Sequence, residues 1–206
     1  MVDGAGSFDC IVLAAGASRR MGRSKLYLSF GGRTLIETTV GHALGAGARV
    51  IVVARPEDDR LAELLARDAE IVRNPDPERG MLSSLREALS LVSAERFFFI
   101  PADMPLVGSG VYRAMAALGA AVPVIPRARG RSGHPVLLPS SLIPAIRALP
   151  EGKTLKELIA EAGAVYLDLE DESVLADIDT AADYEAAAAS GWTAARSALG
   201  RSGAAG

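Results

Sequence analysis

The sequence predicts an α/β domain of three layers, with a mostly parallel central sheet and helices on both faces. Short apolar runs that indicate buried strands, such as residues 11–14, 49–54 and 96–100, alternate with amphipathic helical patterns. Parallel neighbours in a sheet need crossover connections, which helices supply. The chain has 206 residues, half of them apolar, and this is enough to bury one sizeable core.

Composition restricts the class of protein. The formal net charge of −3 argues against a general nucleic-acid binder, because such proteins need an extended basic surface. The single cysteine, Cys10, excludes internal disulfides and predicts a buried thiol, which fits a reducing compartment. The sequence shows neither a signal-peptide pattern nor an apolar stretch of membrane-spanning length. We therefore expect a cytoplasmic protein that binds neither nucleic acid nor membrane.

The expected domain boundaries follow the apolar patterning. A single domain is predicted over residues 9–190, after a disordered segment 1–8. Residues 191–206 are rich in Gly, Ser and Ala and have too little apolar bulk to pack, so a flexible or weakly helical tail is expected.

The first predicted strand leads into a loop that is rich in glycine and positive charge. Glycine lets backbone N–H groups approach a phosphate closely, and cationic side chains can neutralise its charge. The residues with these properties, together with two serines, are Gly16, Ser18, Arg19, Arg20, Gly22, Arg23, Ser24 and Lys25. The spacing differs from that of the Walker P-loop. We interpret the segment as a polyanion-binding loop, and the alternative is a solvated basic turn.

Helix and strand alternate after this loop. A short extended segment, 26–30, ends at a Gly-Gly turn, and Thr34-x-x-Glu37 is typical of the capping box that begins a helix. Gly45 and Gly47 end that helix. The elements expected next are a strand 49–54, a helix 57–67, a strand 70–72, a helix from about 80 to 92, and the strand 96–100.

The second half of the chain has weaker patterns. The elements expected there are a helix 108–118, a strand 122–126, a basic mobile loop 127–133, an extended segment 134–138, helices 140–148 and 154–162, a strand 165–169 and an alanine-rich helix from Thr180. Prolines interrupt the strand 122–126, and proline cannot donate to a sheet ladder.

The helix expected near residue 80 begins with small and hydroxylated residues. Gly80, Ser83 and Ser84 would leave N–H donors at its N-terminus for an anion or the edge of a nucleobase. The alternative is that Ser84-x-x-Glu87 is a simple helix cap.

Carboxylates follow the predicted sheet at two places. Asp103 comes directly after the strand 96–100, where ligands bind in open parallel sheets. Asp177 and Asp179 are two apart on an extended segment and point to the same side. Mg²⁺ is usually held by one or two carboxylates with phosphate oxygens and water, so Asp103 and Asp177 are candidate metal ligands. Asp179 is the less favoured ligand, because it also suits the N-cap of the final helix.

The two histidines differ in context. His42 lies within a predicted helix and is expected to be a packed or surface residue. His134 stands between Gly133 and a proline, beside the basic segment. His134 could act as a general base. Phosphoryl-type transfer from a good leaving group to an ionised acceptor, however, needs positioning and charge stabilisation more than proton removal.

A family resemblance rests on these same residues. The pattern Leu13-Ala14-Ala15-Gly16-x-Ser18-x-Arg20-Met21-Gly22-x-x-Lys25 resembles the signature of the molybdenum-cofactor nucleotidyltransferases, within the nucleotide-diphospho-sugar transferase superfamily. Pro-Ala-Asp103-Met-Pro and Ala-Asp177-Ile-Asp-Thr are similar to the family's metal-ligand motifs, although Ala181 stands where the family usually has proline. The Gly133-His134-Pro segment resembles its acceptor-side motif.

The resemblance implies a Rossmann-like fold and a set of site residues. The implied catalytic residues are Arg20, Lys25 and Asp103. The implied nucleotide-binding residues are Leu13, Ala14, Ala15, Gly16, Ser18, Arg20, Gly22, Lys25, Asn74, Gly80, Ser83, Ser84 and Asp103. Gly133 and His134 are the implied acceptor-binding residues, and Asp103 with Asp177 would hold Mg²⁺.

The implied reaction is Mg²⁺-dependent transfer of a nucleoside monophosphate to a phosphorylated small-molecule acceptor, with release of pyrophosphate. The resemblance implies molybdopterin as the acceptor and transient contact with a molybdoenzyme or its chaperone. Ala14-Ala15-Gly16 resembles the cytidylyl-transferring members, whereas guanylyl-transferring members carry Ala-Gly-Gly, so CTP is favoured. The alternatives are a sugar- or polyol-phosphate nucleotidyltransferase and a non-catalytic nucleotide-binding regulatory domain.

Overall fold

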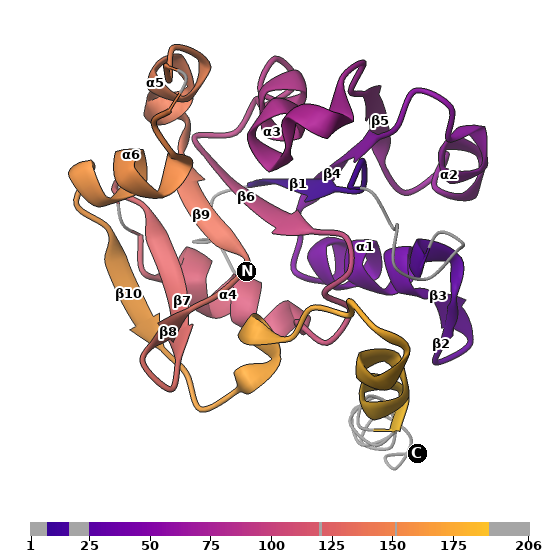
Figure 1. Cartoon of the computed structure of the whole chain (residues 1–206). Helices are drawn as coiled ribbons and strands as arrows, with labels where there is room; N and C mark the ends of the chain where they lie inside the picture. Colours follow the sequence, from indigo (N-terminus) through magenta and orange to yellow (C-terminus); the bar gives the residue numbers. More distant parts are fainter. Residues whose placement is uncertain (1–7, 17–24, 120, 151, 190–206) are drawn as a thin grey trace, which may run out of the picture.

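The protein is built on an eight-stranded, mostly parallel sheet (Figure 1). A computed structural model describes residues 8–16, 25–119, 121–150 and 152–189. The strands are β1 (Asp9–Leu13), β4 (Arg49–Ala54), β5 (Glu70–Arg73), β6 (Arg96–Pro101), β7 (Val124–Ala128), β8 (Arg131–Ser132), β9 (Val136–Pro139) and β10 (Val165–Asp168). Their order is β10-β7-β9-β6-β1-β4-β5, with β8 paired to β7. Of the described pairings in this sheet, only those that involve β9 and β8 are antiparallel.

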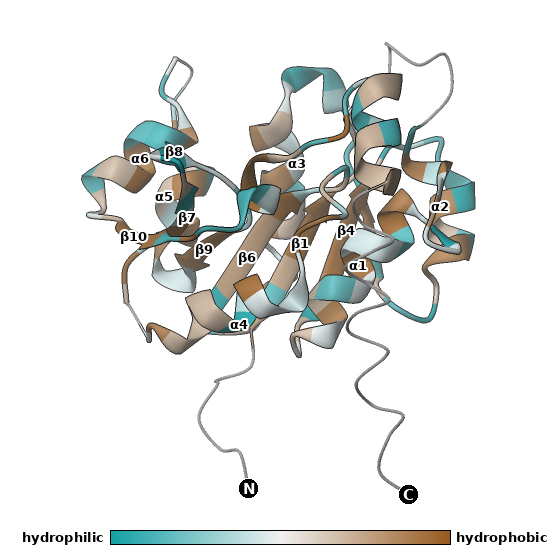
Figure 2. Cartoon of the chain, turned by 90° about the horizontal axis from the view of Figure 1, so that it is seen from below, coloured by the Kyte–Doolittle hydropathy of each residue, from teal (hydrophilic) through white to brown (hydrophobic). Residues whose placement is uncertain are grey.

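Helices cover both faces of this sheet, as expected. On one face lie α1 (Leu35–Gly45) and α4 (Ser109–Ala117), and on the other lie α3 (Met81–Ala88), α5 (Ile143–Arg147) and α6 (Leu155–Glu161) (Figure 1). The smaller elements are η1 (Lys25–Tyr27), the hairpin β2 (Ser29–Phe30) and β3 (Arg33–Thr34), α2 (Asp59–Leu64), η2 (Pro77–Arg79), η3 (Ser140–Leu142), η4 (Glu172–Leu175) and the helical residues 181–189. Figure 2 shows the hydrophobic strands β6, β1 and β4 between helices of mixed hydropathy.

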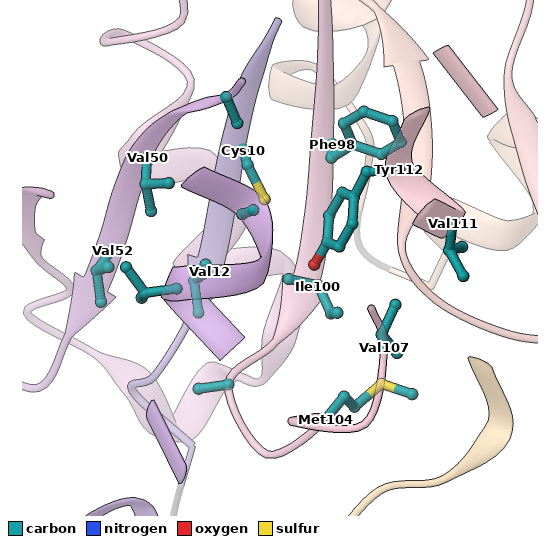
Figure 3. Close-up of a cluster of buried hydrophobic side chains, with 14 of the residues drawn as sticks. Cys10, Val12, Val50, Val52, Phe98, Ile100, Met104, Val107, Val111 and Tyr112 are labelled. Atoms are coloured by element: carbon teal, nitrogen blue, oxygen red, sulfur yellow. The ribbon is translucent and has the colours of Figure 1, made fainter. Parts of the chain in front are cut away.

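The alternation of β1 divides the core into two layers. Cys10, Val12 and Ala14 belong to the buried cluster that includes residues of α1 and α4, such as Val40 and Tyr112. The next residues along the strand, including Ile11, point to the other cluster, with residues of α3, α5 and α6. In Figure 3 the Tyr112 ring lies beside Phe98, with ring centroids 5.2 Å apart. The Cys10 side chain is buried, which confirms the predicted buried thiol, and this burial raises the pKa of the thiol.

Strong local signals gave correct elements. The Thr34 hydroxyl accepts from the Glu37 N–H at 3.3 Å, and the Glu37 carboxylate accepts from the Thr34 N–H at 2.8 Å, which confirms the capping box of α1. The strand 49–54 is confirmed without change, and Phe8 is already part of the core at 3 % exposure. The helices expected over 57–67 and 80–92 are shorter, and the segment 26–30 begins as the 3-10 turn η1 rather than as a strand.

The expectation of a mobile basic loop over residues 127–133 is wrong. These residues form the end of β7 and the strand β8, joined by a tight turn. Arg129 and Gly130 have positive φ angles of 49° and 73°, as the turn requires. The guanidinium of Arg127 pairs with Asp168 of β10 at 2.6 Å, so a residue distant in sequence neutralises this cation and orders the segment.

The strand order creates a switch point at the middle of the sheet. The chain passes from β1 to β4 and β5 on one side, and then returns to β6 on the other side of β1. Ligands of open α/β sheets bind outside the carboxyl ends of the strands at such a point. The carboxyl ends of β1 and β6 are Leu13 and Pro101, which lie opposite each other in register.

Within the described ranges, none of the helices is both long and apolar enough to cross a membrane.

Candidate active site

The polyanion-binding loop leaves the sheet at its switch point. The Ala14 N–H donates to the Val53 carbonyl at 2.8 Å, which holds the chain against β4 until the loop begins. A Cβ placed on Gly16 would meet no atom of the described structure within 4 Å, so its backbone borders open space. This is the condition under which backbone N–H groups can approach a phosphate. Ser18, Arg20 and Gly22 lie outside the described residues.

Lys25 joins the end of this loop to two carboxylates. Its Nζ lies 2.6 Å from Asp103 Oδ2 and 2.7 Å from Asp179 Oδ1, and its side chain is 11 % exposed. Burial alone would lower the pKa of Lys25, but the hydrogen bonds to Asp103 and Asp179 outweigh it and hold the pKa above its ordinary value. Lys25 is therefore a fixed positive charge at the switch point.

The C-terminal segment reaches the site through a buried anchor. The Ile178 N–H donates to the Asp103 carbonyl at 3.0 Å, and the Ile178 side chain is 1 % exposed in a cluster with Phe30. The expectation that Asp179 caps the final helix is wrong. Thr180 takes that position, and its hydroxyl accepts from the Asp183 N–H at 3.2 Å. The Asp179 carboxylate is thus directed to Lys25.

These elements surround a pocket of about 290 Å³. The expected residues that line it are Leu13, Ala14, Gly16, Lys25, Gly80, Ser84, Asp103 and Asp179. Sequence reasoning missed Leu26, Pro77, Met81, Pro101 and Ala102, which complete the lining. Met81 is the one with a recognisable signal, because it lies within the Gly80–Ser84 helix start and its apolar side chain is 49 % exposed.

Three expected nucleotide-binding residues, Ala15, Asn74 and Ser83, do not line the pocket. Ala15 is 1 % exposed and packs in the cluster of Leu85. Asn74 is 1 % exposed and donates to the hydroxyls of Ser83 and Ser84 at 2.9 and 3.0 Å. Asn74 and Ser83 therefore position Ser84, which itself lines the pocket.

The expected acceptor residues pack against η4. A Cβ on Gly133 would lie 2.1 Å from the Val174 carbonyl oxygen, so glycine is required there for close packing. The His134 N–H donates to that same oxygen at 2.9 Å. Burial lowers the pKa of His134, although the charges of Asp103 and Asp177 act to raise it, so the imidazole is neutral at pH 7. His42 lies half-buried in α1 and does not line the pocket.

One oxygen of the site has no partner in the described structure. Asp103 Oδ1 is buried and accepts no hydrogen bond from any described residue. An unpaired buried carboxylate oxygen is costly, and a hard cation is one group that would satisfy it. No three His, Cys, Asp or Glu side chains of the described ranges are arranged as a complete metal site. This donor set fits a Mg²⁺ ion that takes its remaining ligands from phosphate and water.

The switch-point pocket, the loop glycine and the lysine beside two carboxylates are the arrangement expected of a nucleotide-binding transferase. The family model described as the MobA-like NTP transferase domain matches residues 10–165, and the chain belongs to this family. Molybdenum cofactor cytidylyltransferase of Escherichia coli (strain K12) is 28% identical over 180 residues, covering 86% of this chain and 94% of that protein.

A further relative and a solved structure are also similar to this chain. A probable molybdenum cofactor guanylyltransferase from Synechococcus elongatus is 31% identical over 101 residues, which cover 48% of this chain and 52% of that one. The crystal structure of Rv0371c from Mycobacterium tuberculosis H37Rv superposes with a TM-score of 0.79 at 24% identity, covering 91% of this chain and 100% of that one. Rv0371c has also been crystallised in complex with manganese. The protein is a nucleotidyltransferase, close to the molybdenum cofactor cytidylyl- and guanylyltransferases.

Proposed function

We propose that the protein transfers CMP from CTP to the phosphate of molybdopterin cofactor. A phosphate oxygen of the acceptor attacks the α-phosphorus of CTP and forms a new P–O bond. The bond from the α-phosphorus to the bridging oxygen of the β-phosphate breaks, and its electron pair leaves with pyrophosphate. The product is a diphosphate-linked dinucleotide, and no covalent enzyme intermediate is required.

The observation that carries this proposal is the cluster of Lys25, Asp103 and Asp179, which lines the pocket together with Gly16. Lys25 and its two carboxylates carry a net negative charge, so the cluster suits a triphosphate that binds together with a divalent cation. The cation and Lys25 would then stabilise the negative charge that shifts toward the leaving group. Lys25 would hold the triphosphate, and the backbone at Gly16 would border it. Arg20 remains a proposed second cation of the loop.

Asp103 and Asp177 are the proposed Mg²⁺ ligands. Asp103 Oδ1 is the unpaired buried oxygen described above, and Asp177 and Asp103 both act electrostatically on His134. Lys25 engages Asp103 through Oδ2, which leaves Oδ1 for the cation, and it engages Asp179 through Oδ1. Asp177 is proposed ahead of Asp179 on the sequence motif, while Asp179 is the one of the two that lines the pocket. When bound, the cation would neutralise phosphate charge. Lys25 keeps the triphosphate in place, and the neutral imidazole of His134 together with Gly133 borders the acceptor side.

The preference for cytosine over guanine is proposed to depend on the part of the pocket wall that α3 forms. A relative that covers 86% of this chain is described as a cytidylyltransferase. This chain has the Ala14-Ala15-Gly16 version of the loop. Ala15 packs with Leu85 of α3, so a change at position 15 would act on the base through the position of Met81 and Ser84 rather than by direct contact.

Pyrophosphate release tests this function. The purified enzyme is incubated with Mg²⁺ and each of CTP, GTP, ATP and UTP, with molybdopterin cofactor, with sugar phosphates, or with no acceptor. We expect release with CTP and molybdopterin cofactor only. Release with sugar phosphates would instead show a sugar-phosphate nucleotidyltransferase, and binding without release under any condition would show a regulatory domain. Turnover that favours GTP would overturn the cytidylyl assignment.

A further inference from the structure

Three side chains of the segment that leads from β4 into α2 contact both ends of the polyanion-binding loop. The segment runs from Arg55, directly after β4, to Arg60 in the first turn of α2. The loop enters at Ala15 and ends at Lys25, which begins η1. Sequence patterns gave these residues no role, and none of Arg55, Asp58, Arg60 and Tyr27 lines the pocket.

Arg55 holds the entry to the loop. Its Nη1 donates to the Ala15 carbonyl at 3.1 Å, directly before Gly16. Its Nε and Nη2 pair with Glu57 at 2.8 Å and with Glu78 at 3.1 Å. Glu78 lies in η2, which forms part of the opposite pocket wall through Pro77. A guanidinium has the fixed fork that three such contacts need, whereas lysine offers a single ammonium.

Tyr27 holds the exit of the loop. Its hydroxyl donates a short hydrogen bond to Asp58 Oδ1. The guanidinium carbon of Arg60 lies 4.2 Å from the centroid of the Tyr27 ring. Asp58 Oδ1 also accepts from the Leu61 N–H at 3.1 Å and so caps α2. The turn that carries Lys25 is therefore fastened to the start of a helix.

We propose that residues 55–60 form a brace that sets the two ends of the polyanion-binding loop, with Arg55 and Tyr27 as positioning residues for the β- and γ-phosphates of the bound nucleotide. Gly16 and Lys25, which line the pocket, are then already in position before the triphosphate arrives, so less of the binding free energy is lost in ordering them. In the proposed function Lys25, whose turn the brace holds, binds the triphosphate, so the brace should affect triphosphate binding more than monophosphate binding. The inference rests on the proposed function for its choice of ligand.

The test compares binding of a triphosphate with binding of its monophosphate. Wild type is first titrated by calorimetry with CTP, GTP, ATP and UTP in Mg²⁺, and the triphosphate that binds and its monophosphate then serve as probes. Tyr27→Phe removes only the hydroxyl, and Arg55→Lys keeps the positive charge but loses the planar set of N–H donors that makes three contacts. We expect each change to raise the dissociation constant of the triphosphate about tenfold and that of the monophosphate by less than about twofold.

Two further variants separate positioning from general loosening. Arg113→Lys is the matched control, because Arg113 Nη1 also donates to a backbone carbonyl, that of Gly45 at 2.9 Å, far from the loop. It should leave both affinities unchanged. Asp58→Asn keeps an oxygen that can accept from both Tyr27 and Leu61, so near-normal triphosphate affinity is expected.

The outcomes distinguish the brace from the proposed function. If one triphosphate binds wild type but binds Tyr27→Phe and Arg55→Lys equally well, the brace is wrong and the proposed function stands. Equal loss of triphosphate and monophosphate affinity would also overturn the brace, because it would show a general structural effect. If none of the four triphosphates binds wild type, both proposals fail.

Discussion

Lys25 is the residue on which the two carboxylates of the site converge. One ammonium facing Asp103 and Asp179 leaves a net negative cluster at the pocket, which disfavours a polyphosphate until a cation is added. The arrangement is therefore suited to binding a nucleotide together with a divalent ion. It also holds Lys25 in place while the pocket contains no ligand.

Replacing Lys25 tests its role directly. We expect Lys25→Ala to lower pyrophosphate release at least about a hundredfold at saturating CTP, because charge on the triphosphate loses its fixed partner. The thermal unfolding midpoint should fall only modestly, since Asp179 is 46 % exposed and water can solvate it. Lys153→Ala is the control, because Lys153 forms an exposed pair with Glu161 at 2.8 Å away from the pocket. Near-normal turnover of Lys25→Ala would contradict the assignment.

Asp103 is the residue whose charge the metal assignment requires. Asp103→Asn keeps the shape of the side chain but loses the charge, so we expect turnover to fall by orders of magnitude and the Mg²⁺ requirement to rise. The measurement is a Mg²⁺ titration of initial rate, with Asp168→Asn, at the exposed Arg127 pair, as the control. An unchanged Mg²⁺ titration for Asp103→Asn would remove Asp103 from the metal site.

Among the elements, the packing of the segment between β8 and β9 depends on Gly133. The Gly133 N–H donates to the Pro126 carbonyl at 2.9 Å, while a Cβ at this position would lie 2.1 Å from the Val174 carbonyl oxygen. Backbone atoms cannot move aside as a flexible side chain can. The segment that carries His134 can therefore pack against η4 only without a side chain at residue 133.

We expect Gly133→Ala to lower the free energy of unfolding by about 1–3 kcal/mol through overpacking. Gly110→Ala, in α4, is the matched control, because its added Cβ would meet no atom within 4 Å of the described structure. That change should raise the free energy of unfolding by about 0.5 kcal/mol through reduced backbone entropy. Urea denaturation measures both, and equal stabilities of the two variants would contradict the packing argument.

Element prediction succeeded where the signal is local. The capping box at Thr34 and the apolar run of β4 depend on neighbouring residues, so sequence patterns give them with correct bounds. The hairpin of β7 and β8 was missed because its order depends on Arg127 meeting Asp168, 41 residues later. Short-range patterns carry no information about such pairs.

For the whole molecule, the sequence predicted the three layers and the switch-point site, but not how distant segments share it. Strand and helix alternation is enough to imply a parallel sheet and the edge where ligands bind. The contact of Lys25 with Asp179 spans 154 residues, and sequence patterns could not distinguish it from a helix cap. The burial of Ala15 was missed for a related reason, because it depends on packing against Leu85 of α3, which is distant in sequence.

The C-terminal segment couples the stability of the molecule to its site. Ile178 is 1 % exposed in the cluster with Phe30 and Leu35, and its backbone is bonded to Asp103. Ile178→Ala should therefore lower the free energy of unfolding by about 2–4 kcal/mol, the usual range for a buried Ile-to-Ala change. It should also weaken CTP binding, because a loosened segment no longer holds Asp179 beside Lys25.

Ile159→Ala supplies the comparison that isolates this coupling. Ile159 is 6 % exposed on α6, in the other core cluster, so its loss creates a similar cavity in the opposite layer. Urea denaturation should show comparable destabilisation in the two variants, while calorimetric titration with CTP in Mg²⁺ should show a raised dissociation constant for Ile178→Ala only. Equal CTP affinities in the two variants would mean that the C-terminal segment stabilises the fold without organising the nucleotide site.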